Sequence, residues 1–414
     1  MMTPIYFVED GRIEGLYPLT YSRPAGLLRC GDSTLLERAQ RLLPRPAEGL
    51  LADETFVDAG ATVGRLPLNP KIEPSLGAIF INTRWLMTGP FSDPPPDMAG
   101  SAGGTFAWMH VSPKRLASAD LAGPGTPIHA LEELLGALRT QAVDALIIRY
   151  PWDLIRHQRT MLEADFTFHG QAVRSEPMPG ARLMHADRVH IAENVKIYPG
   201  AVLDAGEGPI IIDRGAVIRA NSVITGPVYV GNDSIVRTGA DIREETSIGP
   251  NCRVGGEVIG SIFFANSNKQ HEGFMGQSII GEWVNIGAGT ITSNLKNTYG
   301  EVRMPIGGVE QNTGTNFLGS VIADHAKIGI GVCLSTGSAI GFASHVLDPR
   351  PPKFIPSFAW ATGAEIKRLD FQKAVDIAKI VMARRSRDFS RADEEAFMRI
   401  FRSCAQIEKF RWPE

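Results

Sequence analysis

Residues 212–258 read IDRGAVIRANSVITGPVYVGNDSIVRTGADIREETSIGPNCRVGGEV, and an aliphatic residue recurs at every sixth position of this stretch. The recurring residues are Ile212, Ile218, Ile224, Val230, Val236, Ile242, Ile248 and Val254. Four positions after each stands a compact residue, namely Ala216, Ser222, Val228, Ser234, Ala240, Thr246, Cys252 and Val258. A period of six fits neither an amphipathic helix nor a plain strand. It is typical of hexapeptide repeats, so we predict a left-handed parallel β-helix with three hexads per coil and both sets of residues pointing inward.

The same register extends beyond this stretch and is interrupted twice. It includes Ile191 and Ile197 upstream, and Ile280, Ile286, Ile322, Ile328, Leu334 and Ile340 downstream. The hexads break between residues 258 and 280 and again between residues 290 and 322. Insertions in a solenoid are loops on one face, often the binding face. We therefore expect loops at both breaks and look for functional residues there.

The segments on either side of the repeat predict two further domains. Buried-strand candidates at 5–8, 78–81 and 145–148, with helices at 33–43 and 128–138, indicate a mixed α/β domain, and residues 89–104 are expected to form a loop. A proline-rich linker at 349–353 precedes predicted helices at about 364–385 and 391–407, which we expect to cover an end of the β-helix. The predicted domains are 1–170, 171–348 and 349–414.

Composition limits the classes of partner and compartment. The chain has 414 residues, 42 Lys and Arg against 45 Asp and Glu, and a net charge of −3, which argues against nucleic acid as an obligate partner. Its four cysteines lie far apart and support neither a disulfide framework nor a cysteine zinc site. Because the sequence shows no signal-peptide pattern and no apolar run of about 20 residues, we expect a cytoplasmic protein with no membrane partner.

The two interruptions carry the most specific motif of the chain. It reads His271-Glu272-Gly273-Phe274-Met275-Gly276, followed by Asn285-Ile286-Gly287-Ala288-Gly289-Thr290 and then Asn294. This pattern resembles the acetyltransferase half of bacterial GlmU, a bifunctional acetyltransferase and uridyltransferase of amino-sugar phosphates. The stretches 16–24, 82–85, 150–154 and 267–271 resemble the divergent GlmU-like sugar nucleotidyltransferases still more closely. The resemblance covers nearly all of residues 1–345.

The resemblance implies roles for individual residues. His271 would be the general base that takes a proton from the substrate amine, a task suited to an imidazole. Arg237 would bind the sugar phosphate, Asn285 and Asn294 the amino sugar, and Ala288 and Ser320 acetyl-CoA. Asparagine is also a common corner residue, and small residues are also required by packing, so each of these positions has a purely structural alternative.

Two departures from the family motif bear on the acceptor. Phe274 replaces a tyrosine, and Gly255 falls where a phosphate-binding lysine is expected. Lys269, Lys296 and Lys327 are alternatives that spacing alone does not separate, and Lys269 is included in the predicted site. The acceptor is therefore expected to differ from glucosamine-1-phosphate.

The N-terminal domain lacks part of the motif that its resemblance would require. Sugar nucleotidyltransferases open with a loop of the form G-G-x-G-T-R-L-x-P-L-T, whose backbone N–H groups hold phosphates. This chain keeps residues 16–20, Leu-Tyr-Pro-Leu-Thr, but has Glu9 and Asp10 where glycines are expected. Two carboxylates repel a triphosphate unless Mg²⁺ stands between them. Arg23 is the predicted phosphate contact, and Asp153 is a candidate ligand for Mg²⁺, although the metal ligands are not identified.

Three hypotheses follow from these motifs. The first is a CoA-dependent N-acyltransferase with a degenerate or altered nucleotidyltransferase domain, acting on an amino-sugar phosphate or a nucleotide-linked amino sugar. The second is a fully bifunctional acetyltransferase and sugar-1-phosphate nucleotidyltransferase. The third is a non-enzymatic β-helix protein used for assembly or sensing. Because enzymes of the resembling type place their sites between neighbouring β-helices, we expect a homotrimer.

Overall fold

The computed structural model describes residues 2–52, 62–63, 65–119, 126–363 and 365–412. Contacts divide the chain into two compact units that interleave in sequence. The first contains residues 1–16, 22–28 and 33–150, and the second contains residues 17–21, 29–32 and 151–414. The predicted domain boundaries at 170 and 348 remain predictions.

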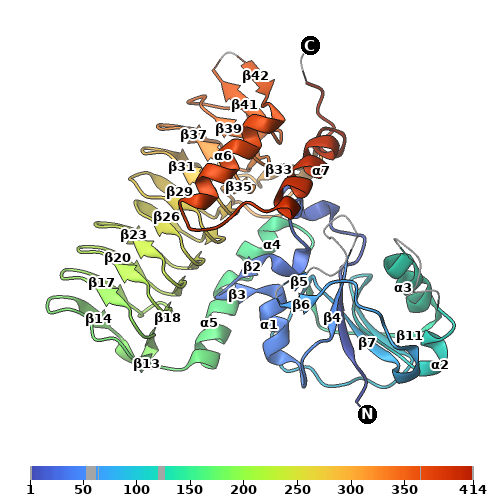
Figure 1. The fold of residues 1–414 in the computed structure, drawn as a ribbon. Helices are drawn as coiled ribbons and strands as arrows, with labels where there is room; N and C mark the ends of the chain where they lie inside the picture. The colour runs from blue at the N-terminus through green and yellow to red at the C-terminus, as the bar shows by residue number, and fades with distance from the viewer. Residues whose placement is uncertain (1, 53–61, 64, 120–125, 364, 413–414) are drawn as a thin grey trace. The chain divides into compact units, whose positions relative to one another are not determined.

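The first unit is built on a mixed six-stranded sheet (Figure 1). In spatial order its strands are β11 (Arg139–Ala142), β9 (Met98–Ala102), β10 (Thr105–Val111), β7 (Ala78–Asn82), β1 (Ile5–Val8) and β4 (Gly49–Leu51). Strand β1 is parallel to β4 and β7, whereas β10 is antiparallel to β7 and β9. Separate apolar clusters form on the two faces of the sheet, with Ile5 and Ile79 in one and Tyr6 and Phe80 in the other. The sheet is therefore buried on both sides, as in α/β proteins.

Helices α1 (Leu35–Leu42), α2 (Pro113–Leu116) and α3 (Thr126–Ala137) accompany this sheet. Helix α1 starts with a capping box, because the Thr34 hydroxyl accepts from the Glu37 N–H and the Glu37 carboxylate accepts from the Thr34 N–H. The predicted strands at 5–8 and 78–81 and the predicted helices at 33–43 and 128–138 are confirmed. The strand expected at 145–148 is reduced to β12 (Leu146–Ile147), which pairs with β8 (Trp85–Leu86).

One predicted loop contains a strand. Residues 89–104 were expected to be irregular, but β9 occupies Met98–Ala102. Gly100 lies opposite Trp108 in the ladder, and a Cβ on Gly100 would come within 2.4 Å of the indole. In the sequence Gly100 suggests a loop. In the structure it is a strand residue whose missing side chain leaves room for the Trp108 indole.

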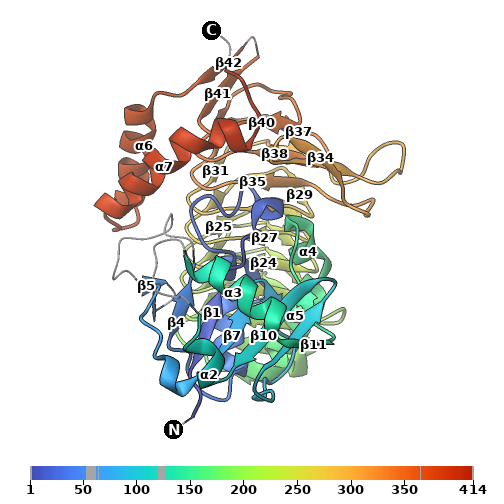
Figure 2. The same ribbon diagram turned by 90° about the vertical axis from the view of Figure 1, so that its right-hand side faces the viewer.

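The second unit is a parallel β-solenoid whose strands stack in three faces (Figures 1 and 2). We name each face by its first strand. The β13 face contains β13 (Ala172–Val173), β15 (Val189–Ile191), β18 (Ile210–Ile212), β21 (Val228–Val230), β24 (Thr246–Ile248), β27 (Ile262–Phe263), β30 (Ile279–Ile280), β35 (Ser320–Ile322), β38 (Ser338–Ile340) and β40 (Phe354–Ile355). The β16 face contains β16 (Lys196–Ile197), β19 (Val217–Ile218), β22 (Ile235–Val236), β25 (Arg253–Val254), β28 (Asn268–Lys269), β31 (Asn285–Ile286), β36 (Lys327–Ile328), β39 (His345–Val346), β41 (Ala359–Thr362) and β42 (Glu365–Arg368). The β14 face contains β14 (Arg182–Met184), β17 (Val202–Asp204), β20 (Val223–Thr225), β23 (Asp241–Ile242), β26 (Glu257–Ile259) and β29 (Phe274–Gly276).

The hexapeptide prediction is confirmed by burial. All eight aliphatic residues from Ile212 to Val254 are fully buried in one core. The compact residues four positions later are also buried, at 2% exposure or less. The predicted fold class, an α/β unit followed by a parallel β-helix with C-terminal helices, is therefore confirmed.

The first predicted loop does not exist. Between residues 258 and 280 the solenoid continues through β27, β28 and β29, each paired in parallel with strands of the neighbouring coils. Phe263 and Lys269 take inward positions there, and the steps from Val258 to Phe263 and from Met275 to Ile280 are five residues long, so the period of six is lost although the strands continue. The second interruption is real, because it contains the antiparallel hairpin of β33 (Arg303–Ile306) and β34 (Val309–Asn312).

The end of the solenoid differs from the prediction. The proline-rich stretch is part of a coil, since the Pro349 carbonyl accepts from the Cys333 N–H, and β40 and β41 follow it. Antiparallel β42 then covers the edge of β41, so the helix expected from residue 364 starts only at α6 (Phe371–Ala383). Helix α7 (Arg391–Ile407) agrees with its prediction. Figure 2 shows both helices beside the last coils, where they share a core with Phe342 and Phe358.

Two helices precede the solenoid within the second unit. They are α4 (Pro151–Arg156) and α5 (Gln158–His169). Leu162 of α5 packs on Ile211 and Tyr229 of the β13 face, and the Ser247 hydroxyl donates to the Gly31 carbonyl at 2.7 Å. Within the described part of the chain, every helix is too short or too polar to cross a bilayer.

Candidate functional site

His271 lies at the corner where the chain leaves the β16 face for the β14 face, which we call the His271 corner. The residue is exposed, between β28 and β29. Its carbonyl accepts from the Lys269 ammonium at 2.9 Å, and the carbonyl of the next residue, Glu272, accepts from the Gly289 N–H of the following coil at 3.1 Å. The backbone is therefore fixed from both sides while the imidazole stays open to solvent, a position from which it can exchange a proton with a bound substrate.

Lys269 does not occupy the surface position predicted for a phosphate contact. It is fully buried, in register with Val254 in the interior of the solenoid. Besides the His271 carbonyl, its ammonium donates to the Gly255 carbonyl at 3.3 Å. Burial lowers its pKa from 10.5 to about 8, opposed by the nearby Glu272 carboxylate. The structure thus offers no support for a contact between Lys269 and substrate phosphate.

Arg237 lies at the same corner, two coils before His271. Its N–H donates to the Val254 carbonyl, which places it beside Gly255. A Cβ on Gly255 would lie 2.9 Å from the Arg237 Cβ, so a lysine at that position would collide with the arginine. The glycine that departs from the family motif therefore makes room for the half-buried Arg237.

Ala288 is the third predicted residue at this corner, one coil after His271. It is half-buried, and its carbonyl accepts from the Gly331 N–H at 2.8 Å. The structure thus brings Arg237, His271 and Ala288 together along one edge of the solenoid.

The two predicted asparagines lie apart from each other. Asn285 is exposed on the β16 face, in register with Asn268 and Lys327. Asn294 follows β32 (Ile291–Thr292), and its Nδ2 donates to Gln277 Oε1 at 2.5 Å near the opposite edge of the β14 face. A single solenoid therefore does not gather both side chains around His271.

Ser320 has a side chain that faces the interior. The residue is fully buried in β35, and its N–H donates to the Ser278 hydroxyl at 2.9 Å, as Ser278 N–H does to Ser261 at 3.1 Å. The structural alternative, a small inward residue required by packing, accounts for the size and burial of this side chain, and its hydroxyl makes no hydrogen bond.

The acidic residues of the N-terminal loop are engaged within the first unit. The Arg84 guanidinium donates to Asp10 at 2.8 Å through Nε, and both side chains are buried. Glu9 is 1% exposed and accepts from the Ala25 N–H. Arg23, the predicted phosphate contact, is only 8% exposed. These positions leave little for a nucleotide phosphate to contact.

The candidate metal ligands do not fit Mg²⁺ either. Asp153 pairs with Arg156 one helical turn away at 3.1 Å. Over the residues for which the structure gives positions, no three His, Cys, Asp or Glu side chains group so as to hold a metal ion.

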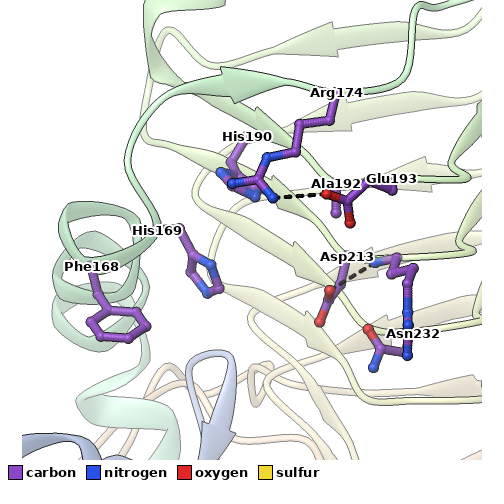
Figure 3. Close-up of a pocket in the computed structure, with 9 residues that line it drawn as sticks. Phe168, His169, Arg174, His190, Ala192, Glu193, Asp213 and Asn232 are labelled. Atoms are coloured by element: carbon purple, nitrogen blue, oxygen red, sulfur yellow. Dashed lines mark hydrogen bonds and ion pairs between the residues drawn. The ribbon is translucent and has the colours of Figure 1, made fainter.

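A pocket of about 500 Å³ opens between α5 and the first coils, well away from the His271 corner in sequence (Figure 3). Several of its ionisable groups have partners: Arg174 pairs with Glu193 at 2.9 Å, and Asp213 accepts from the Tyr229 hydroxyl outside the pocket at 3.1 Å. His169 pairs with Asp32 at 2.7 Å. None of the residues predicted for acyl transfer lines this pocket.

Sequence reasoning did not single out the segment that follows α6. There, Arg385 donates to the Asn268 side chain at 2.8 Å and so reaches the β16 face, one strand from Asn285. The only signal in the sequence is the group of arginines at 384, 385 and 387, which by itself indicates no more than a helix end.

Comparison with known proteins agrees with the resemblance. Residues 5–172 match the sequence model of a family described as sugar nucleotidyl transferase. The chain is 32% identical over 152 residues to a bifunctional protein GlmU from Synechococcus sp. (strain CC9311), covering 36% of this chain and 31% of the relative. It is 40% identical over 136 residues to a bifunctional protein GlmU from Methanococcus maripaludis, covering 32% and 33%.

Two further similarities complete the comparison. A bifunctional sugar-1-phosphate nucleotidylyltransferase/acetyltransferase from Sulfurisphaera tokodaii is 32% identical over 158 residues, covering 37% of this chain and 36% of the relative. The chain thus matches about a third of the length of these relatives. Among solved structures, a UDP-N-acetylglucosamine acyltransferase from Campylobacter jejuni aligns with 15% identity and a TM-score of 0.28, covering 55% of this chain and 84% of that one.

Proposed function

We propose that the protein is a CoA-dependent N-acyltransferase, with acetyl as the acyl group, that acts on an amino-sugar phosphate or a nucleotide-linked amino sugar. The observation that carries this proposal is the position of His271. It is exposed on a corner whose backbone is fixed by Lys269 and by Gly289, within a motif that resembles the GlmU acetyltransferase. The GlmU relatives named above support the class of reaction.

The proposed reaction is a single acyl transfer. The His271 imidazole takes a proton from the substrate amine as the amine nitrogen attacks the carbonyl carbon of acetyl-CoA. An N–C bond forms, the C–S bond breaks, and the proton on His271 returns to the CoA sulfur. Arg237 would hold the acceptor phosphate through its guanidinium, and the small Ala288 would leave room for the thioester.

The acceptor site would be completed by a second copy of the chain. Asn285 lies on the β16 face and Asn294 near the far edge of the β14 face, so both reach one substrate only if neighbouring solenoids contribute one each. We propose a homotrimer on this ground, since closed rings form from such heterologous contacts.

The alternative is a bifunctional enzyme that also joins a nucleotide to the sugar phosphate. The match of residues 5–172 to the sugar nucleotidyl transferase family favours it. The engagement of Asp10 by Arg84 and the burial of Glu9 and Arg23 favour a degenerate or altered first unit instead.

The test is a thioester-consumption assay with acetyl-CoA and a panel of amino-sugar phosphates and nucleotide-linked amino sugars. We expect turnover in the wild type and a loss on the order of 10²–10⁴-fold in His271→Ala. His157→Ala serves as the control because that histidine belongs to the segment between α4 and α5. No turnover with any acceptor would instead favour the third hypothesis, a β-helix protein used for assembly or sensing, and equal rates in both variants would remove His271 from the reaction.

A further inference from the structure

One asparagine of the β16 face, Asn268, has two arginines as neighbours. Arg253 and Asn268 are direct neighbours in the parallel ladder, so their backbones lie about 4.8 Å apart and their side chains leave the same face. The Arg385 guanidinium, which comes from the segment after α6, donates to Asn268 Oδ1 at 2.8 Å. Asn268 is therefore the strand neighbour of one arginine and the hydrogen-bond partner of the other, and the charge of Arg253 acts on Arg385.

Among the residues that the structure describes, neither Arg253 nor Arg385 forms an ion pair with a carboxylate. The charges that act on Arg385 are those of Arg253 and Arg384, together with the buried Cys252 thiol. Burial first, and then the charges of the two neighbouring arginines, lower the pKa of Arg385. An anion bound between the guanidinium groups would remove this repulsion, and a phosphate can accept two N–H bonds from each guanidinium.

Arg253 and Arg385 lie near the place where the family motif would have a cation for the substrate phosphate. Arg253 precedes Gly255, where the motif would have a phosphate-binding lysine, by two residues, and Asn268 is also in register with Asn285. Cations are therefore present next to the predicted sugar-binding asparagine, although none stands at the expected place. One of them comes from the C-terminal segment, outside the part of the chain that resembles GlmU.

We infer that Arg253 and Arg385 form a binding site for a phosphate or diphosphate group of the substrates, with Asn268 between them. The inference rests on the proposed function for the identity of the ligand. The phosphate belongs either to the acyl donor or to the amino-sugar acceptor, and both share the chemistry that two guanidinium groups recognise.

The experiment measures binding to the full chain by calorimetry, with inorganic pyrophosphate as the probe. We expect Arg253→Gln and Arg385→Gln each to weaken binding at least tenfold, while Arg387→Gln, an exposed arginine two residues further on, binds like the wild type. Repeating the titration with coenzyme A and with an amino-sugar 1-phosphate identifies the source, because only the ligand that uses the site loses affinity.

A second variant separates binding from a merely structural role. Asn268→Asp places a carboxylate between the two arginines, so it should keep or raise the thermal stability of the protein while abolishing pyrophosphate binding. Unchanged pyrophosphate affinity in all three variants would overturn the inference. Turnover of acetyl-CoA in the wild type is measured separately, so loss of binding without any turnover would leave the anion site standing and reject the proposed function.

Discussion

At the residue scale, Lys269 is the clearest departure from the hexapeptide pattern. It occupies an aliphatic position of the core, and its ammonium is bonded to the backbone of His271 and Gly255. A buried cation is costly compared with the valine or isoleucine of neighbouring coils. Its cost is consistent with a role in fixing the corner that carries the proposed base.

The charge of Lys269 makes the stability of the protein depend on pH in a definite direction. Its pKa falls to about 8 in the folded protein, whereas the unfolded chain holds this proton up to about pH 10.4. Between these values the unfolded state binds more protons, so the free energy of unfolding should rise with pH. Lys269→Met should remove this part of the rise. The free energy of unfolding of the wild type should therefore increase relative to that of the variant between about pH 8 and about pH 10.4.

The measurement is chemical denaturation of both proteins at several pH values across this window. A stability difference that stays constant with pH would contradict the assignment of the lowered pKa to Lys269. The same variant should lower acyl transfer by about tenfold or more if the corner is positioned by the ammonium, and hydrogen exchange at the amides of residues 271–273 should accelerate even where activity cannot be measured.

At the scale of single strands, adjacent residues of β20 give a matched test of the inward and outward positions. Ile224 is fully buried in the solenoid core, whereas Val223 beside it is 39% exposed. Ile224→Ala should cost about 2–5 kcal/mol through lost burial and a cavity. Val223→Ala should cost less than about 1 kcal/mol, since most of its side chain already contacts water.

Thermal unfolding followed by circular dichroism compares these two variants with the wild type. A similar loss of stability in both variants would mean that the inward and outward sides of the strand do not differ in packing. The period of six would then not mark the residues of the core.

The sequence predicts the solenoid well because its constraint repeats. Each aliphatic residue must fill the same narrow interior, so the register from Ile212 to Val254 is visible without any structure. The prediction is wrong where tertiary contacts replace the usual residue. Phe263 and Lys269 fill interior positions and concealed two regular strands, and Gly100 is a strand residue because Trp108 packs over it.

The candidate site was predictable only in part. Arg237, His271 and Ala288 share one corner because they are about whole coils apart: His271 follows Arg237 by 34 residues and Ala288 follows His271 by 17, close to two coils and one coil of three hexads. Motif spacing does not reveal that Lys269 and Ser320 face the interior. Successive residues of a strand alternate between the interior and the outer surface, so a shift of one position reverses the assignment. Nor does it connect Arg385 to Asn268, 117 residues earlier, because that contact depends on where α6 ends.

At the scale of the whole molecule, the separation of Asn285 from Asn294 predicts assembly. We expect a homotrimer in solution, measured by light scattering with the mass of three chains of 44.9 kDa each. A stable monomer that still turns over substrate would show that one solenoid suffices and would contradict the shared site.

The last prediction concerns the chemistry of the first unit. Nucleotidyl transfer needs phosphate contacts and, in most such enzymes, a divalent cation held by carboxylates. Here Asp10 is held by Arg84, Asn82 Nδ2 donates to the same carboxylate at 2.9 Å, and Glu9 caps the turn at Ala25. The loop carboxylates are thus parts of a hydrogen-bonded core, and freeing Asp10 for a metal would leave the buried Arg84 without its counter-charge.

We therefore expect weak or no pyrophosphate release when the full chain is incubated with Mg²⁺, each common NTP and several sugar 1-phosphates, under conditions in which acyl transfer proceeds. Asp10→Asn should lower stability by about 3–5 kcal/mol, because it leaves Arg84 buried and unpaired, and should leave acyl transfer of the folded fraction unchanged. Robust pyrophosphate release from the wild type with any pair of substrates would mean that another loop holds the phosphates, and the bifunctional reaction would then be the better description of the protein. The two assays on one preparation decide between these outcomes, since acyl transfer reports on the solenoid and pyrophosphate on the α/β unit.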